Sequence, residues 1–139
     1  MVHSPPILAA FDADVDPLAG GGVENTQLRS AEAFIHANLC ESFSLQDLTE
    51  AVGTSPSTLL RTFNSHLGVS PMQYVKRLRL EAVRRLLLDT DSTKGTVGDV
   101  ALRFGFRQLG RFSADYRKAY GELPSATLRR RRHSGIQEL

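Results

Sequence analysis

Cationic and aromatic side chains share the C-terminal third of the sequence. In the stretch GFRQLGRFSADYRKAYGELPSATLRRRRH, residues 105–133, aromatic residues stand four positions apart at Phe112, Tyr116 and Tyr120, and arginine fills 129–132. Residues four apart lie on one face of a helix, which leaves the other face to the cations. A guanidinium binds phosphates and the edge of guanine through two parallel hydrogen bonds. This stretch therefore favours recognition of an anion.

Residues that could carry covalent or metal chemistry are sparse. The histidines at 3, 36, 66 and 133 show no ligand spacing, and no Ser/His/Asp or Cys/His signature accompanies them. Cys40 is the single cysteine, which excludes an internal disulfide and a cysteine-based zinc cluster. We therefore expect no enzyme activity, no catalytic residue, no metal and no cofactor. A reducing, cytoplasmic setting follows from the same cysteine count.

The net charge of +2 conceals a strong segregation of charge along the chain. Residues 1–55 hold one basic and eight acidic side chains, a net charge of −7, whereas residues 56–100 carry +3 and residues 101–132 carry +7. A basic C-terminal half favours a polyanionic partner. A solvated basic face would give the same charge pattern, so charge alone leaves both readings open.

The elements that would position these cations are helices. Residues 1–23 are rich in proline, glycine and aspartate and end in AGGGV, which predicts a flexible linker or the remnant of an upstream domain. From residue 24 onward, apolar residues recur at helical spacing, with almost no alternating β-branched run. We predict an all-α domain over 24–132 with about seven helices, followed by a tail at 133–139.

Capping residues divide this domain into short helices. Ser44 with Asp47 three positions later resembles a capping box, as does Thr96 with Asp99, and Gly53 fits the left-handed position that ends a helix. The Ser-Pro pairs at 55–56 and 70–71 each supply an N-cap followed by proline in the first turn. These signals predict closely spaced helices joined by tight turns.

A long helix from Pro71 to Leu88 would join two groups of shorter helices. At 1.5 Å per residue it would span about 27 Å. Its periodicity predicts one buried stripe with the basic residues mostly outside. The members of that stripe are Val75, Leu78, Ala82, Val83 and Leu86.

The order of capped helix, glycine turn, second helix and Gly-x-x-Pro exit occurs twice. With one residue added in the second turn, Leu59 and Phe63 correspond to Phe112 and Tyr116 as apolar anchors. This is the layout of a helix-turn-helix, whose second helix can enter the DNA major groove. The predicted units are about 44–68 and 96–121, with recognition helices at about 55–67 and 108–120.

The sequence also resembles the DNA-binding domain of AraC/XylS-type bacterial transcription regulators, over roughly residues 26–130. The resemblance rests on SLQDLTEAVGTSPSTLLRTFNSHLGVSPMQYVKRLRLEAVRRLLL and on TVGDVALRFGFRQLGRFSADYRKAYGELPSATLR. It implies seven helices, with the third and sixth in successive major grooves. It also implies a longer regulator with an N-terminal effector-binding or dimerisation domain, so we expect this chain to be a fragment.

Side chains off the buried stripes are the candidates for contact with base edges. Arginine can pair with guanine and glutamine with adenine, and an exposed Leu60 would suit a thymine methyl group unless it is a partly buried flank of the core. By the resemblance most candidates match DNA-facing places, as do Gly110 and Ala114, which have no hydrogen-bonding side chain. The candidates are Ser57, Thr58, Leu60, Arg61 and Asn64 on the first recognition helix, and Gln108, Leu109, Arg111, Ser113 and Arg117 on the second.

A second set of residues would contact phosphates, which position a protein on DNA without reading its sequence. For the arginines at 129–132 a disordered basic tail is the alternative. The phosphate candidates are Ser55, Arg107, Lys118, Arg129 and Arg130.

The expected partner is double-stranded DNA at a promoter operator, and RNA polymerase is expected beside it. We expect a monomeric DNA-binding domain, with dimerisation left open for the full-length protein, because the joining helix could place two recognition helices one DNA turn, roughly 34 Å, apart. No apolar run approaches the roughly 18 residues of a membrane span. The alternative function is a basic helical protein-interaction module, whose binding need not weaken steeply with salt.

Overall fold

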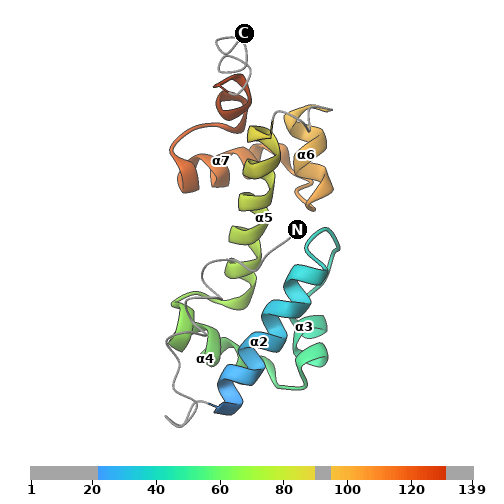
Figure 1. Cartoon of the computed structure of the whole chain (residues 1–139), viewed down its shortest axis with the longest axis vertical. Coiled ribbons are helices and arrows are strands. Elements are labelled where there is room, and N and C mark those ends of the chain that lie inside the picture. Colours follow the sequence, from blue (N-terminus) through green and yellow to red (C-terminus); the bar gives the residue numbers. More distant parts are fainter. Residues whose placement is uncertain (1–21, 90–94, 131–139) are drawn as a thin grey trace. The chain divides into compact units, whose positions relative to one another are not determined.

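The computed structural model describes residues 22–89 and 95–130, and no strand occurs in either range. One of the helices covers residues 124–130 and carries no label in Figure 1. The all-α prediction with about seven helices is therefore confirmed over the described ranges. The six labelled helices in Figure 1 are α2 (Gly22–Ala37), α3 (Leu45–Val52), α4 (Pro56–Leu67), α5 (Pro71–Leu88), α6 (Val97–Arg103) and α7 (Leu109–Tyr120).

The chain forms two compact units. The first contains the described residues up to Asn38 together with Phe43–Tyr74, and the second contains Leu39–Ser42 and the described residues from Val75 onward. The first unit holds the α3–α4 pair and the second holds the α6–α7 pair. These two pairs match the predicted helix-turn-helix units.

The predicted capping boxes are present before α3 and α6, the first helices of the two helix-turn-helix pairs. Before α3, Ser44 Oγ accepts the N–H of Asp47 at 3.1 Å, and the Asp47 carboxylate accepts the N–H of Ser44 at 2.9 Å. Before α6, Thr96 and Asp99 make the same two bonds at 3.2 and 3.0 Å. Gly53 ends α3 with a φ of +81°, the left-handed conformation that the sequence predicted. These reciprocal bonds satisfy backbone donors that have no partner within a helix.

The start of α2 corrects the predicted domain boundary. Gly22 and Val23 belong to the helix, so the domain begins two residues before the predicted position at residue 24. The Thr26 hydroxyl donates to the Gly22 carbonyl at 2.9 Å, and Glu24 places a negative charge in the first turn, where the helix dipole favours it. Residues 1–21 of the predicted linker lie outside the described residues. So do residues 131 and 132 of the predicted domain and the predicted tail at 133–139.

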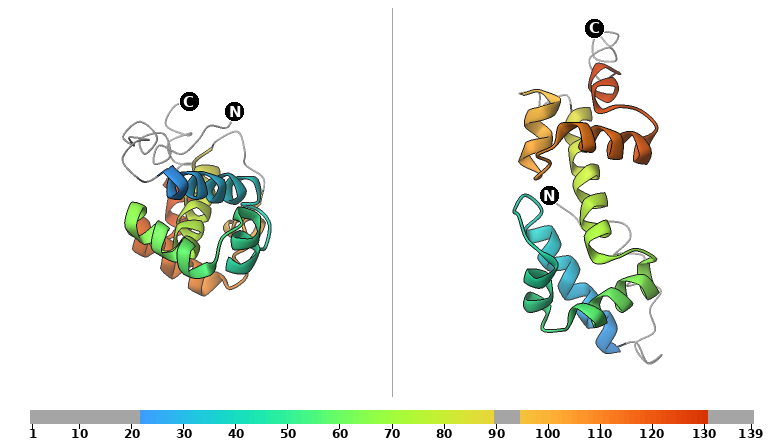
Figure 2. Two further views of the ribbon diagram at one scale, coloured as in Figure 1. Left: turned by 90° about the horizontal axis from the view of Figure 1, so that it is seen from below. Right: turned by 180° about the vertical axis from the view of Figure 1, so that it is seen from behind.

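The first unit packs α2 against α3 and α4, and Figure 2 shows α2 beside α3. The anchor Phe63 is fully buried and meets the Tyr74 ring edge-on, with 5.6 Å between ring centroids. The Tyr74 hydroxyl donates to the buried carboxylate of Glu32 at 2.5 Å. Glu32 and Tyr74 thus form a buried polar contact, which the apolar periodicity of the sequence did not predict.

The second unit buries residues of α5, α6 and α7 in one cluster, and Figure 2 shows α7 lying across α5. The predicted α5 stripe is partly wrong, because Ala82 and Leu86 are only half-buried while Leu80 and Leu87 are buried. The cluster consists of Leu80, Val83, Leu87, Val100, Ala101, Phe112 and Tyr116.

Two arginines of α5 are half-buried and bind other residues of the second unit, although the sequence predicted the basic residues of this helix to be mostly outside. Arg79 is half-buried and donates to the backbone carbonyls of Leu39, at 3.0 Å, and Glu41, at 2.5 Å. Burial lowers the pKa of the Arg79 guanidinium from its ordinary value. Arg84 is also half-buried and takes part in the polar cluster described below. Both arginines therefore contribute hydrogen bonds to the second unit. The spacing of the apolar residues alone does not indicate this role.

Candidate nucleic-acid interface

The first recognition helix, α4, presents a polar side opposite its buried anchors. Leu59 and Phe63 are fully buried, whereas Ser57, Arg61 and Asn64 are exposed. The 4-residue spacing of the anchors fixes one face against the core and turns the other outward. Arg61 stands in the middle of this outer side, where its guanidinium is accessible to a base edge or a phosphate.

Two α4 candidates are engaged in capping the helix. Ser55 Oγ accepts the N–H of Thr58 at 3.2 Å and donates its proton to Thr58 Oγ1 at 3.0 Å. Thr58 is half-buried. Any contact of these two hydroxyls with DNA would therefore have to share or replace the capping bonds.

Leu60 and Asn64 lie on the outer side one turn apart. The Asn64 amide donates to the Leu60 carbonyl at 3.0 Å. Leu60 keeps 36% of its surface exposed. It is therefore partly covered yet accessible, which fits both the thymine-methyl reading and the reading as a flank of the core.

The second recognition helix, α7, is anchored by a ladder of aromatic rings. Phe112 and Tyr116 are buried, and ring centroids are 4.8 Å apart for Phe106 and Phe112, 5.8 Å for Phe112 and Tyr116, and 4.8 Å for Tyr116 and Tyr120. The Arg84 guanidinium carbon lies 4.7 Å from the centroid of the half-buried Tyr120 ring. Burial raises the pKa of the Tyr120 hydroxyl to about 12. The three predicted anchors of this helix therefore all face the interior.

The outer side of α7 brings together most of the predicted contact residues. Ser113 differs from the other candidates because it is half-buried. Gly110 and Ala114, the two small residues of this side, are exposed. Arg111, Arg117 and Lys118 are exposed on the outer side, Gln108 and Leu109 are exposed at the start of the helix, and Arg107 is exposed in the preceding turn.

The first turn of α7 lies beside an open cleft of about 330 Å³. Its lining includes Lys76, Arg107, Arg111 and Asp115, and Lys76 Nζ lies 2.9 Å from the Asp115 carboxylate. Gln108, the N-cap residue of α7, makes no capping bond with its side chain within the described part of the chain. Three cations and one carboxylate give the cleft a positive balance, which suits a phosphate.

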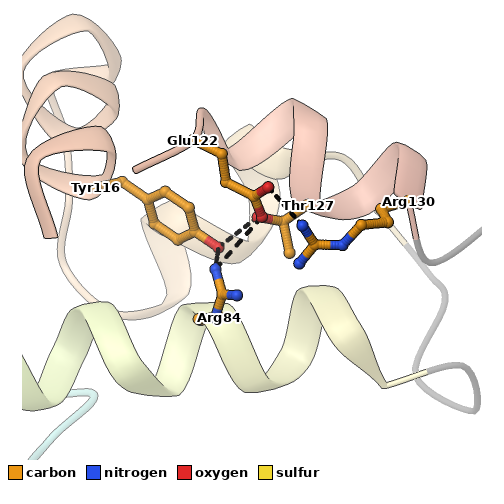
Figure 3. Close-up of polar contacts among 5 residues, drawn as sticks. All are labelled: Arg84, Tyr116, Glu122, Thr127 and Arg130. Carbon is orange, nitrogen blue, oxygen red and sulfur yellow. Dashed lines mark hydrogen bonds and ion pairs between the residues drawn. The ribbon is translucent and has the colours of Figure 1, made fainter. Parts of the chain in front are cut away.

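A polar cluster closes the second unit behind α7, shown in Figure 3. It contains Arg84, Tyr116, Glu122, Thr127 and Arg130, and below it is called the Glu122 cluster. Thr127 donates to the Glu122 carboxylate through a short hydrogen bond. The hydroxyls of Tyr116 and Thr127 are 2.8 Å apart. The cluster therefore ties the helix at 124–130 to α5 and α7.

The ion pairs of this cluster involve one predicted phosphate contact. Arg130 Nη1 lies 2.7 Å from Glu122 Oε1, and Arg84 Nη1 lies 3.4 Å from Glu122 Oε2. The hydrogen bond from Thr127, with the charges of Arg130 and Arg84, lowers the pKa of Glu122, although burial acts in the opposite direction. Arg130 thus pairs with Glu122 while remaining exposed, whereas the exposed Arg129 makes no ion pair with the described residues.

Positions 129 and 130 are helical, so the alternative of a disordered basic tail does not hold for them. In residues 22–89 and 95–130, no group of three His, Cys, Asp or Glu side chains could hold a metal ion. None of the described helices is long and apolar enough to cross a membrane.

Comparisons with known proteins bear on this arrangement. A family model described as a helix-turn-helix domain matches residues 48–130. The solved structure of a probable AraC family transcriptional regulator from Rhodopseudomonas palustris is 39% identical, with a TM-score of 0.70, covering 76% of this chain and 96% of that one. The chain belongs to the AraC/XylS family of transcription regulators. The resemblance seen in the sequence is therefore confirmed, and this family is not one of enzymes.

Two further transcription regulators are similar to the chain. The XylDLEGF operon transcriptional activator of Pseudomonas putida is 39% identical over 105 residues, which are 76% of this chain and 33% of that protein. The DNA-binding domain of AdpA, solved in complex with a target DNA, is 29% identical with a TM-score of 0.70, covering 80% of this chain and 97% of that one. The chain thus spans about a third of the length of that full activator.

Proposed function

We propose that this chain is the sequence-specific DNA-binding part of a transcription regulator, with α4 and α7 entering successive major grooves. The observation that supports the proposal is that α4 and α7, the second helices of the two pairs, bury and expose corresponding kinds of residues. Each buries two apolar anchors, Leu59 with Phe63 and Phe112 with Tyr116, and each exposes polar and cationic side chains on its outer side. A helix of this kind fits the width of the major groove of DNA.

The two outer sides would differ in how they read bases. On α4, Arg61 is the central candidate for guanine, with Ser57 and Asn64 beside it. On α7, Gln108 and Arg111 supply hydrogen bonds at the first turn, which is where recognition helices meet base edges. Arg107, beside Gln108, and Lys118, two turns beyond Arg111, would bind phosphates and set the register.

The AdpA complex supports the choice of DNA as the partner, since that family member was solved on a target DNA. We further propose that the chain acts at promoter operators beside RNA polymerase, in the cytoplasm. The DNA-binding part would bind as a monomer, with dimerisation left to other parts of a longer regulator. The relatives named as operon activators are consistent with this setting.

Selection of duplexes from a random pool, followed by affinity measurements at several salt concentrations, tests the proposal. A single preferred sequence should emerge, and log K should fall linearly with log salt, by about 0.9 for each phosphate contact. A scrambled duplex of equal length is the control. Binding that ignores both the sequence and the salt concentration would contradict the proposal and favour a basic protein-interaction module.

A further inference from the structure

One large apolar side chain is exposed on α7, and it rests on a glycine. Leu109 keeps 49% of its surface exposed, although it stands beside the buried face of the helix. A Cβ atom placed on Gly98 of α6 would lie 3.3 Å from Leu109 Cδ1. A contact that close would be tighter than most carbon contacts, so a side chain at residue 98 would press on Leu109, whereas glycine leaves Leu109 room beside α6.

Gly98 is the second residue of α6. Its φ is not in the left-handed region, so the backbone does not require glycine there. A side chain at residue 98 would crowd Leu109, which is a packing reason for glycine there.

The packing against Gly98 restricts Leu109 without covering it. An isolated exposed leucine needs no explanation, because folded proteins expose many apolar atoms. A leucine held on one side by a neighbouring backbone is different, since fewer rotamers remain open to it. Less side-chain entropy is then lost when a partner covers the exposed side.

The surroundings of Leu109 specify the kind of partner. Leu109 is the first residue of α7, and the exposed hydrogen-bonding side chains of Gln108 and Arg111 flank it. The first turn of a recognition helix meets base edges in the major groove. The apolar feature of those edges is the 5-methyl group of thymine.

We infer that Leu109, held in place by Gly98, reads a thymine methyl group in the half-site of α7. The inference rests on the proposed function and adds one base preference to it. The flanking Gln108 and Arg111 would hydrogen-bond to neighbouring bases, so the methyl contact discriminates thymine from cytosine where no hydrogen bond is needed. A first half-site contact by Leu60 would be independent of it.

Replacing single thymines by uracil in the selected duplex tests this inference, because uracil lacks only the methyl group. The 139-residue chain should lose about fourfold in affinity at one thymine of the half-site where Arg111→Ala relaxes base preference. Uracil at the other thymines of that half-site should change affinity less. This measurement needs no variant of Leu109.

Variants then assign the loss to Leu109. With Leu109→Ala the thymine and uracil duplexes should bind equally at that position. Gly98→Ala should reduce the difference, because a Cβ at 98 pushes Leu109 aside while the leucine is retained. Leu60→Ala is the matched control and should leave the difference unchanged. Melting temperatures of all three variants establish that the compared proteins are folded.

The inference is overturned if no uracil substitution in that half-site weakens binding, or if the fourfold loss persists with Leu109→Ala. Either result would leave sequence-specific binding by the chain intact. Failure of the chain to bind any duplex would instead contradict the proposed function.

Discussion

α4 and α7 occupy corresponding places in the two units, yet they begin differently. Ser55 caps α4 with its hydroxyl, whereas Gln108 makes no side-chain cap at α7 within the described residues. Side-chain caps satisfy backbone donors that otherwise remain open to a ligand. The first turn of α4 is thus completed internally, while that of α7 faces the cationic cleft beside Arg111.

The interiors of the two units differ as well. In the first, the anchor Phe63 meets Tyr74, whose hydroxyl reaches the buried Glu32. In the second, the anchor Tyr116 carries its own hydroxyl into the Glu122 cluster. The repeated sequence pattern therefore sets where an anchor stands, and the identity of the anchor decides which polar groups must be buried around it.

Truncation of the two central anchors should give the largest effect. Phe63→Ala and Tyr116→Ala should each cost about 3–5 kcal/mol in the free energy of unfolding, since each leaves a cavity in a small core. Tyr116→Ala should cost more, because it also removes hydroxyl contacts to Thr127 and Arg84. Urea titration with circular dichroism measures both values.

Tyr116→Phe provides the matched control for the anchors, because it keeps the ring and removes the hydroxyl. It should cost about 1–3 kcal/mol, the usual penalty for leaving buried polar partners unsatisfied. Equal stability of Tyr116→Phe and the unaltered chain would show that the Glu122 cluster does not depend on this anchor.

Removal of Arg61 and Arg111, the two arginines proposed to read bases, should change base preference in a different half-site for each. Arg61→Ala should cost about 1–3 kcal/mol of binding free energy on the selected duplex and relax preference at one or two positions of one half-site. Arg111→Ala should act in the other half-site. Affinities for single-base variants of the duplex measure this, and an equal loss on scrambled DNA would make the arginine a phosphate contact instead.

Much of this comparison is visible in the sequence. Ser44 with Asp47 and Thr96 with Asp99 cap their helices as predicted, because capping depends on side chains three residues apart. The boundaries of α5 at Pro71 and Leu88 also match. Local chemistry of this kind is complete within a few residues and can be read without tertiary structure.

The contacts that sequence missed join residues far apart in the chain. Glu32 is a buried acid 42 positions from its partner Tyr74, and no periodicity marks it as buried. Arg130 is a predicted phosphate contact, and the sequence does not indicate its ion pair with Glu122 at 2.7 Å. The position of Leu109 beside Gly98 likewise depends on the packing of α6 on α7. Pairings of this kind are set by the fold, so spacing alone does not predict them.

The Glu122 cluster predicts a dependence on pH that the first unit need not share. The folded pKa of Glu122 lies below its ordinary value of about 4.3, so the cluster contributes fully above that pH. Its contribution is lost as the pH falls through the lowered pKa. Stability measured between about pH 5 and pH 2 should fall less steeply for Glu122→Gln than for the unaltered chain, and identical slopes would contradict this role.

Changes at the two N-cap residues should have smaller effects. One removes the side-chain cap of α4, and the other adds a side-chain cap to α7. Ser55→Ala should destabilise the chain by about 1 kcal/mol, because Thr58 loses its capping acceptor. Gln108→Ser should stabilise it by up to about 1 kcal/mol, by supplying the cap that α7 lacks. Thermal unfolding reports both signs. A loss of stability in Gln108→Ser would mean that the first turn of α7 already has its donors satisfied.

The smallest expected effect concerns Lys118, which is exposed on α7 two turns beyond Arg111. A phosphate contact contributes to binding through the release of counterions, which does not depend on base sequence. Lys118→Ala should therefore weaken binding to selected and scrambled duplexes alike, and lower the slope of log K against log salt by about one. Arg111→Ala on the same helix is the comparison, because it should change the base preference. If Lys118→Ala altered preference at a base pair while leaving the salt slope intact, the reading side of α7 would extend beyond its first two turns.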